Sequence, residues 1–251
     1  MNGGEARRYV LSAGRTGTVF FAEFLQDLMP DATVVHEPSP TRQQMMLANL
    51  RNDWGLFGGI LRQWFNRTRV RNENSASRPY IELNPFLCAF SDLLPASDHP
   101  LRIVHMVREP GSWARSMTVF KASTKFRGVI DFVPFAKPFP SPRPEGWGRL
   151  DHYEKNLHRW VWCNQRILAL ADHAEAFATI KYETVFRGTD SDRKAAFQTL
   201  IDTLGLKPDA SADWDKFARP ANPAPPTTEE FDPEAAPRIA GELARKLGYD
   251  L

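Results

Sequence analysis

The sequence lacks several features that would assign the protein to a membrane, secreted or nucleic-acid-binding class. No run approaches the ~20 consecutive apolar residues that a membrane-spanning helix requires. The first eight residues have no apolar region behind them before the first expected strand, so we expect no signal peptide and a cytoplasmic protein. The net charge is only +2, which gives no general indication of nucleic-acid binding. Cys88 and Cys163 are the only cysteines, and we expect both to be free thiols in a reducing compartment.

Two common signatures of phosphate chemistry are also missing. No Gly-Lys-Ser or Gly-Lys-Thr occurs in the chain, so the usual loop for nucleoside triphosphates is absent. The sequence has no His-x-x-x-His pair and no aspartate cluster suited to Mg²⁺. We therefore expect no metal site, and these gaps count against a kinase.

The first informative stretch is residues 9–25, which read as a strand, a small-residue loop and a helix. Residues 9–11 form a short apolar run, and aromatic and leucine residues recur at helical spacing after Gly17. A loop that leads into a helix directs free backbone N–H groups at an anion. Thr16 and Thr18 add hydroxyls and Arg15 adds a positive charge, so this loop is a candidate anion site.

A second device of this kind follows about 90 residues later in the chain. Residues 101–107 are expected to form a strand, and Arg108 stands at its end. Pro110 suits the first turn of the next helix, which places Ser116 about two turns into it. Two such devices at two strand ends indicate a ligand with two separated phosphate-type groups.

These motifs resemble those of sulfotransferases that use 3′-phosphoadenosine 5′-phosphosulfate (PAPS). The family's 5′-phosphosulfate loop is similar to Arg15-Thr16-Gly17-Thr18, and Val19 departs from the family pattern at the last position. The family's 3′-phosphate motif resembles Arg108 with Ser116. The resemblance implies that these residues bind PAPS and that Tyr182, after a later strand, helps to hold the adenine. It covers about half of the chain and implies a P-loop-like fold.

The fold expected from the pattern of the chain agrees with this resemblance. Strands alternate with helices, which predicts an α/β fold with a parallel β-sheet flanked by helices on both faces, a three-layer sandwich. The strands are expected at residues 9–11, 32–36, 79–83, 101–107 and 176–181. The helices are expected from residue 17 to 29, over 40–66 in two pieces, and at 85–94, 110–119, 150–173, 192–204 and 233–247. Residues 1–251 are expected to be a single domain, with an irregular Pro-rich insertion at about 121–149 that crosses the acceptor side.

Transfer of the sulfuryl group from PAPS to an acceptor needs a general base. We expect it at the edge of the sheet where the strands end, beside the two phosphate-binding motifs. Glu37 is our first choice, because family members acting on tyrosine or carbohydrate place a glutamate about this far beyond the loop. His36 is the neighbouring alternative, although alternation along a strand would point only one of the two into the cleft. Glu82 is the third candidate, and a structural ion-pair partner is its competing interpretation.

The sequence leaves the acceptor open. A hydroxyl acceptor, a small molecule or a glycan, is favoured over a peptide tyrosine. The arginines between Arg62 and Arg78 are interpreted as a solvated loop or as a docking surface for an acidic acceptor. Two other functions remain alternatives: a nucleotide-dependent kinase with a variant phosphate loop, and an inactive protein that binds 3′,5′-ADP (PAP) without turnover.

Overall fold

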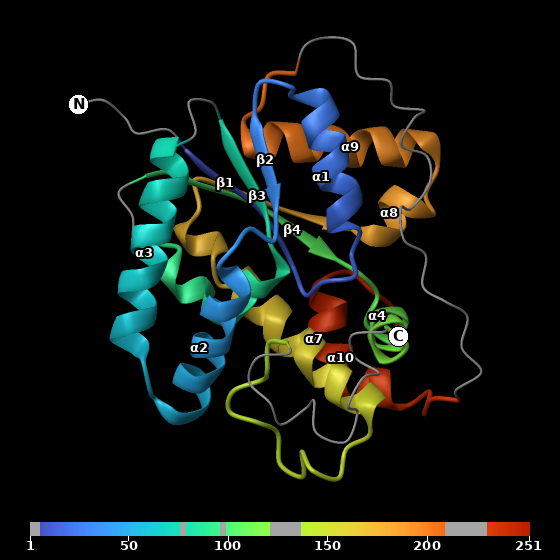
Figure 1. Cartoon of the computed structure of the whole chain (residues 1–251). Coiled ribbons are helices and arrows are strands. Elements are labelled where there is room, and N and C mark those ends of the chain that lie inside the picture. Colours follow the sequence, from blue (N-terminus) through green and yellow to red (C-terminus); the bar gives the residue numbers. More distant parts are fainter. Residues whose placement is uncertain (1–5, 76–78, 96–98, 121–136, 209–229) are drawn as a thin grey trace.

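The computed structural model describes residues 6–75, 79–95, 99–120, 137–208 and 230–251. Its centre is a five-stranded sheet of order β2-β3-β1-β4-β5 in which every pair of neighbours is parallel (Figure 1). The strands are β1 (Arg7–Ser12), β2 (Thr33–His36), β3 (Tyr80–Leu83), β4 (Leu101–Val107) and β5 (Ala176–Lys181). All five predicted strands are confirmed, as is the α/β class.

Helices cover both faces of the sheet, as predicted (Figure 1). One face is covered by α1 (Thr18–Leu28), α8 (Tyr182–Phe186) and α9 (Asp190–Leu204). The other is covered by α2 (Thr41–Trp54), α3 (Gly58–Ser75), the 3₁₀ segment η1 (Pro85–Leu93) and α7 (His152–Leu168). The helices α4 (Pro110–Thr118) and α10 (Ala235–Lys246) pack with α7 around Trp113 and Trp160.

The middle of β1, residues 9–11, is buried on both faces, which explains its uninterrupted apolar sequence. Val10 faces the cluster formed with α1 and α9, whereas Tyr9 and Leu11 face the cluster formed with α2, α3 and α7. On the first face the rings of Phe24 and Phe197 stack with their centroids 4.4 Å apart. The central strand is thus fixed from both sides, and so is the loop that follows it.

The register of the sheet brings five strand ends to one edge. Ser12 pairs with Met106, His36 with Leu83, and Val107 with Lys181. Ligands of open parallel sheets bind beyond the carboxyl ends of the strands. The residues directly after these ends are therefore the ones to inspect for a site.

Three predicted helices differ from the observed ones in their type or their extent. The segment after β3 is a 3₁₀ helix with a kink at Phe90, and α7 ends at Leu168, with the short 3₁₀ turn η2 (Ala171–His173) after it. The helix α3 runs to Ser75 instead of ending near residue 66.

The interpretation of Arg62 to Arg78 as a solvated loop is wrong for most of that stretch. Arg69 is only 1% exposed and forms an ion pair with Glu82 on β3. Thr68 is also buried, and its hydroxyl accepts a hydrogen bond from Gln44 Nε2 at 3.2 Å. These inward contacts extend α3 beyond the apolar pattern. Residues 76–78, with Arg78, lie outside the described residues.

Cys88 and Cys163 are both buried free thiols, as predicted. Their sulfur atoms lie 3.1 Å apart between η1 and α7, and burial raises the pKa of the Cys88 thiol. Most of the predicted Pro-rich insertion, residues 121–136, and residues 209–229 lie outside the described residues. No helix in the described part of the chain has the length and apolar character needed to cross a membrane.

Candidate active site

The loop between β1 and α1 has an unusual backbone. Gly14, Arg15 and Gly17 have positive φ angles of 88°, 53° and 85°. Gly17 is the N-cap of α1, and no side chain in the described part of the chain caps this helix end. The N–H groups of the first helical turn therefore have no intrahelical acceptor and can bind an anion.

The same loop leaves little space for other residue types. A Cβ atom on Gly17 would lie 2.7 Å from ring atoms of Phe186 in α8, so a side chain here would displace that ring. The Thr16 side chain is 1% exposed, and its hydroxyl oxygen has no hydrogen-bond partner within the described residues. A buried hydroxyl without a partner is costly. The loop therefore fits an oxyanion that would accept a hydrogen bond from it.

Arg108, after β4, lies beside this loop. Its Nε donates to Ser112 Oγ at 2.8 Å, and its Nη1 donates to the Arg15 carbonyl at 3.4 Å. Arg15 Nε in turn donates to Ser116 Oγ at 3.3 Å. The structure thus brings together Arg15, Arg108 and Ser116, which are spread over about 100 positions of the chain.

The two guanidinium groups form a cationic pair. Within the described ranges, neither group is joined to a carboxylate by an ion pair. Burial lowers the pKa of Arg15, and the charge of Arg108 lowers it further, while Tyr182 opposes the shift. Burial also lowers the pKa of Arg108, against the opposing effect of Tyr182 and Glu183. An anion bound between the two guanidinium groups would offset the burial of their charges and their mutual repulsion.

Aromatic rings border this cationic pair. The Arg108 guanidinium lies 4.5 Å from the centre of the Tyr182 ring, which packs against Phe186 at 4.5 Å between centroids. The Arg15 guanidinium lies 4.8 Å from the centre of the Phe120 ring. Flat rings beside the cations can pack against a planar base. Phe120 and Phe186 were not predicted as site residues, because phenylalanines in a helical pattern indicate core packing.

Two buried indole groups donate hydrogen bonds to the loops after β1 and β4. Trp113 Nε1 donates to the Gly14 carbonyl at 2.6 Å, and Trp160 Nε1 donates to the Arg108 carbonyl at 2.9 Å. Both rings are fully buried. The carboxylate of Glu109 caps α4 by accepting from Gly111 N at 2.7 Å and from Ser112 N. These contacts fix the backbone on which Arg15 and Arg108 stand.

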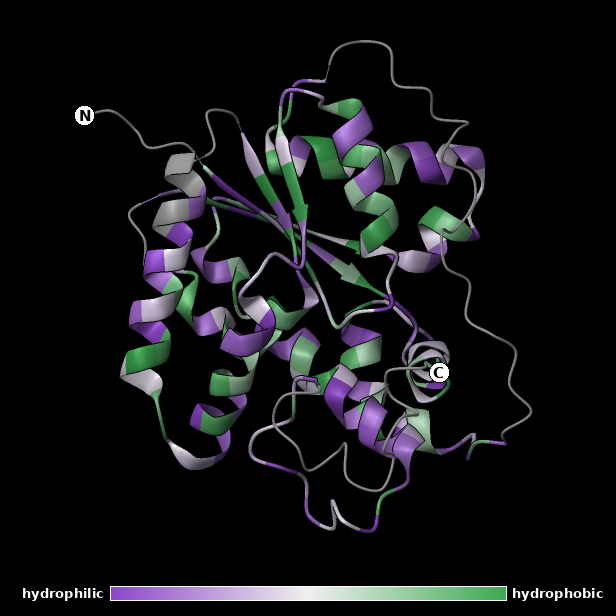
Figure 2. Cartoon of the chain, viewed as in Figure 1, coloured by the Kyte–Doolittle hydropathy of each residue, from purple (hydrophilic) through white to green (hydrophobic). Residues whose placement is uncertain are grey.

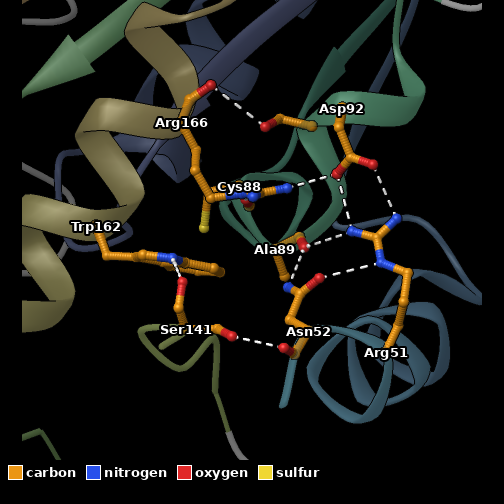
Figure 3. Close-up of polar contacts among 9 residues, drawn as sticks. Arg51, Asn52, Cys88, Ala89, Asp92, Ser141, Trp162 and Arg166 are labelled. Carbon is orange, nitrogen blue, oxygen red and sulfur yellow. Dashed lines mark hydrogen bonds and ion pairs between the residues drawn. The ribbon is translucent and has the colours of Figure 1, made fainter. Parts of the chain in front are cut away.

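Trp113→Phe is expected to weaken PAP binding several-fold, because it leaves the Gly14 carbonyl without its donor and frees the loop. The lost hydrogen bond also costs about 1–3 kcal/mol of stability. Calorimetric titration with PAP and thermal unfolding would measure the two effects. Trp162→Phe is the matched control, since its indole donates to the Ser141 carbonyl at 3.2 Å, outside this site (Figure 3). Equal PAP affinity in both variants would contradict the role given to Trp113.

The three candidate bases fall into different environments. His36 is half-buried, and its Nε2 lies 3.0 Å from Thr18 Oγ1, in the first turn of α1. Burial lowers the pKa of His36, and the charge of Glu37 opposes this shift. Glu37 has a φ of 47°, and its N–H donates to the Leu83 carbonyl at 3.0 Å. The chain therefore leaves the strand at Glu37, directly beside α1, and the alternation of side chains stops there.

Glu82 is a structural residue. Its side chain is fully buried, forms the ion pair with Arg69, and accepts a hydrogen bond from Asn84 Nδ2 at 2.7 Å. Tyr80 Oη donates to it as well, at 3.3 Å. These partners occupy the carboxylate inside the core, so the ion-pair interpretation of Glu82 is the correct one. Among the described residues, no group of three or more His, Cys, Asp or Glu side chains is placed to hold a metal ion.

Comparison with known proteins places this fold. No family model and no curated protein matches the chain. The structure is similar to a sulfotransferase domain from the curacin biosynthetic pathway, with a TM-score of 0.58 and 15% identity over 98% of this chain and 99% of that one. It is also similar to the sulfotransferase domain of the Synechococcus PCC 7002 olefin synthase, with a TM-score of 0.55 and 17% identity over 100% of this chain and 98% of that one. The chain therefore has the fold of the sulfotransferase domains.

Proposed function

We propose that the protein is a sulfotransferase that moves the sulfuryl group of PAPS to an acceptor hydroxyl and releases PAP. The observation that carries this proposal is the pair of loops after β1 and β4. They bring Arg15, Arg108 and Ser116 to one place beside an uncapped helix N-terminus. The likeness of the fold to sulfotransferase domains supports the choice of reaction.

The residues present fit the donor. The Thr16 hydroxyl, which has no partner among the described residues, and Gly17 belong to a loop that would hold the 5′-phosphosulfate, together with Arg15, Thr18 and Val19. Arg108 and Ser116 would bind the 3′-phosphate, and Tyr182 would pack against the adenine. PAPS supplies a sulfuryl group whose transfer leaves negative charge on the 5′-phosphate. Arg15 and the N–H groups of the first turn of α1 would stabilise that charge.

The acceptor hydroxyl loses its proton as its oxygen bonds to sulfur and the bond between sulfur and the bridging oxygen breaks. Glu37 would accept this proton, since it directly follows β2 at the carboxyl edge of the sheet. Its left-handed backbone is uncommon for a glutamate and is the kind of outlier found at functional positions. His36 would orient Thr18 through the 3.0 Å contact and is the second candidate for the base.

The first experiment is thermal unfolding with PAP, with AMP, and with ATP and Mg²⁺. PAP at about 100 times its dissociation constant should raise the melting temperature by about 5–10 °C, because it binds only the folded chain. AMP lacks the second phosphate and should have much less effect. Stabilisation by ATP and Mg²⁺ alone would overturn the proposal in favour of phosphoryl transfer. Stabilisation by PAP without transfer to any acceptor would favour a PAP-binding protein without turnover.

A further inference from the structure

Four large apolar side chains are exposed together at the turn between α2 and α3. Trp54, Leu56, Phe57 and Ile60 are 67%, 47%, 45% and 59% exposed, and we call them the tip patch. Figure 2 shows hydrophobic colour where this turn joins α3 and in the adjoining end of α3. Single exposed apolar side chains are ordinary, whereas a contiguous group of them marks an interaction site.

The backbone of the turn keeps these side chains outside. Gly55, with a φ of 69°, ends α2, and Phe57 has a φ of 64°. A bulky L-residue rarely adopts this left-handed conformation, and such strain is concentrated at functional segments. The Phe57 carbonyl accepts from Leu61 N at 2.8 Å, which starts α3 from this conformation.

The last turn of α2 gives the tip patch a fixed base (Figure 3). Both terminal nitrogens of Arg51 donate to Asp92, at 2.9 and 2.8 Å, and Asn52 Nδ2 donates to the Ala89 carbonyl at 2.9 Å. Ser141 Oγ donates to the Asn52 carbonyl at 2.6 Å. Burial raises the pKa of Asp92, but its contacts with Arg51 and Arg166 outweigh burial and lower it, so the carboxylate stays charged. The patch is therefore presented from an anchored helix end.

The surroundings of the patch are cationic. On the two helices, Arg51 is paired with Asp92 and the buried Arg69 with Glu82, so these two arginines add no charge to the surface of the patch. Asp53, the acidic residue next to the patch, is paired with Arg143. Arg62 and Arg67 are exposed on α3, and Arg67 lies two turns after Ile60 on the same side of the helix. A partner that binds this surface should thus combine an apolar region, which contacts the tip patch, with adjacent negative charge, which contacts the arginines.

We propose that the tip patch docks the protein on an anionic lipid bilayer. Aromatic and aliphatic side chains at a turn enter the boundary between headgroups and acyl chains, while arginines bind the anionic headgroups. The turn lies at the periphery of the molecule (Figure 1). The tip patch lies within seven consecutive residues, Trp54 to Ile60, whereas a stable protein interface uses about 20–30 residues on each side.

Docking through the tip patch leaves the candidate active site open. The helix α2 begins four residues after Glu37, and its 14 residues span about 21 Å, so the patch lies at the other end of the helix. Changes in the patch should therefore leave PAP binding unchanged. This inference does not depend on the reaction that the protein catalyses.

The test is co-sedimentation of the full chain with vesicles of phosphatidylcholine alone and with equal parts of phosphatidylglycerol. The chain should bind the anionic vesicles, with weaker binding at high salt and little binding to phosphatidylcholine. The double variant Leu56→Ser/Phe57→Ser should bind more than about tenfold more weakly. Arg62→Gln/Arg67→Gln should lose affinity only for the anionic vesicles. Leu251→Ser, at a terminal leucine that is 45% exposed, is the matched control and should bind like the unmodified chain.

A second readout follows Trp54 itself. Brominated lipid should quench the tryptophan fluorescence of the unmodified chain, and Trp54→Phe should remove most of this quenching. Equal vesicle binding by the double serine variant would overturn the proposal, as would no binding by the unmodified chain. Self-association that the same variant abolishes would assign the patch to a second copy of the chain. An equal melting temperature of all variants excludes unfolding as the cause.

Discussion

Arg108→Ala is expected to weaken PAP binding by about 10- to 100-fold or more, because it removes charge-assisted hydrogen bonds to a phosphate. The folded state should tolerate this change. Arg108 makes no carboxylate ion pair within the described part of the chain, and burial already lowers its pKa, so its removal breaks no ion pair. Its removal also relieves the repulsion of Arg15. Titration calorimetry with PAP and thermal unfolding without ligand would measure the two expectations.

The control for Arg108→Ala stands on the helix that follows. Arg115 is an exposed arginine of α4 whose guanidinium lies 5.9 Å from the centre of the Phe231 ring, and Arg115→Ala should bind PAP like the unmodified chain. A comparable loss in both variants would indicate a general effect of positive charge. Unchanged affinity of Arg108→Ala would remove the 3′-phosphate site from this place.

The fold could be predicted because its signals are local. Each strand contains a short apolar stretch, and each is followed by residues that end it, as Arg108 and Pro110 follow β4. The likeness of two loops to one family's motifs then indicated a P-loop-like fold, but the order of the strands was not predicted. The parallel order β2-β3-β1-β4-β5 places β4 beside β1, and this adjacency is what brings Ser116 within reach of Arg15.

The hydrogen bonds that support the site could not be predicted, because they depend on the directions in which backbone carbonyls and indole N–H groups point. Trp113 and Trp160 look like ordinary core residues in the sequence, and they are core residues. Their indole N–H groups reach the Gly14 and Arg108 carbonyls only because the two loops turn those carbonyls inward. No period or spacing in a sequence carries that information.

The extent of α3 was missed for a related reason. An arginine in a run of arginines indicates a solvated surface, and only the position of Glu82 on β3 draws Arg69 into the core. The ion pair between Arg69 and Glu82 thus accounts for the helix observed where a loop was predicted. It also removes Glu82 from the candidate bases. That outcome leaves Glu37 and His36 as the residues to separate by experiment.

Glu37→Gln is expected to lower kcat by about 10²- to 10⁴-fold, the usual contribution of a positioned general base. Glutamine keeps the size of the side chain and tolerates the same backbone as glutamate, so the turn after β2 should persist. PAP affinity should stay unchanged, because Arg15, Arg108 and Ser116 are untouched. Single-turnover transfer from PAPS would measure the chemical step, and titration with PAP would measure binding.

Glu23→Gln is the matched control, since Glu23 is an exposed carboxylate on α1, and it should transfer at the unmodified rate. The activity of Glu37→Gln also tests whether His36 is the general base. Loss of the Glu37 charge removes the influence that opposes burial, so the pKa of His36 falls further and its imidazole stays neutral. A neutral imidazole can accept a proton at neutral pH. Full activity of Glu37→Gln would thus make His36 the base, and His36→Asn should then abolish transfer instead.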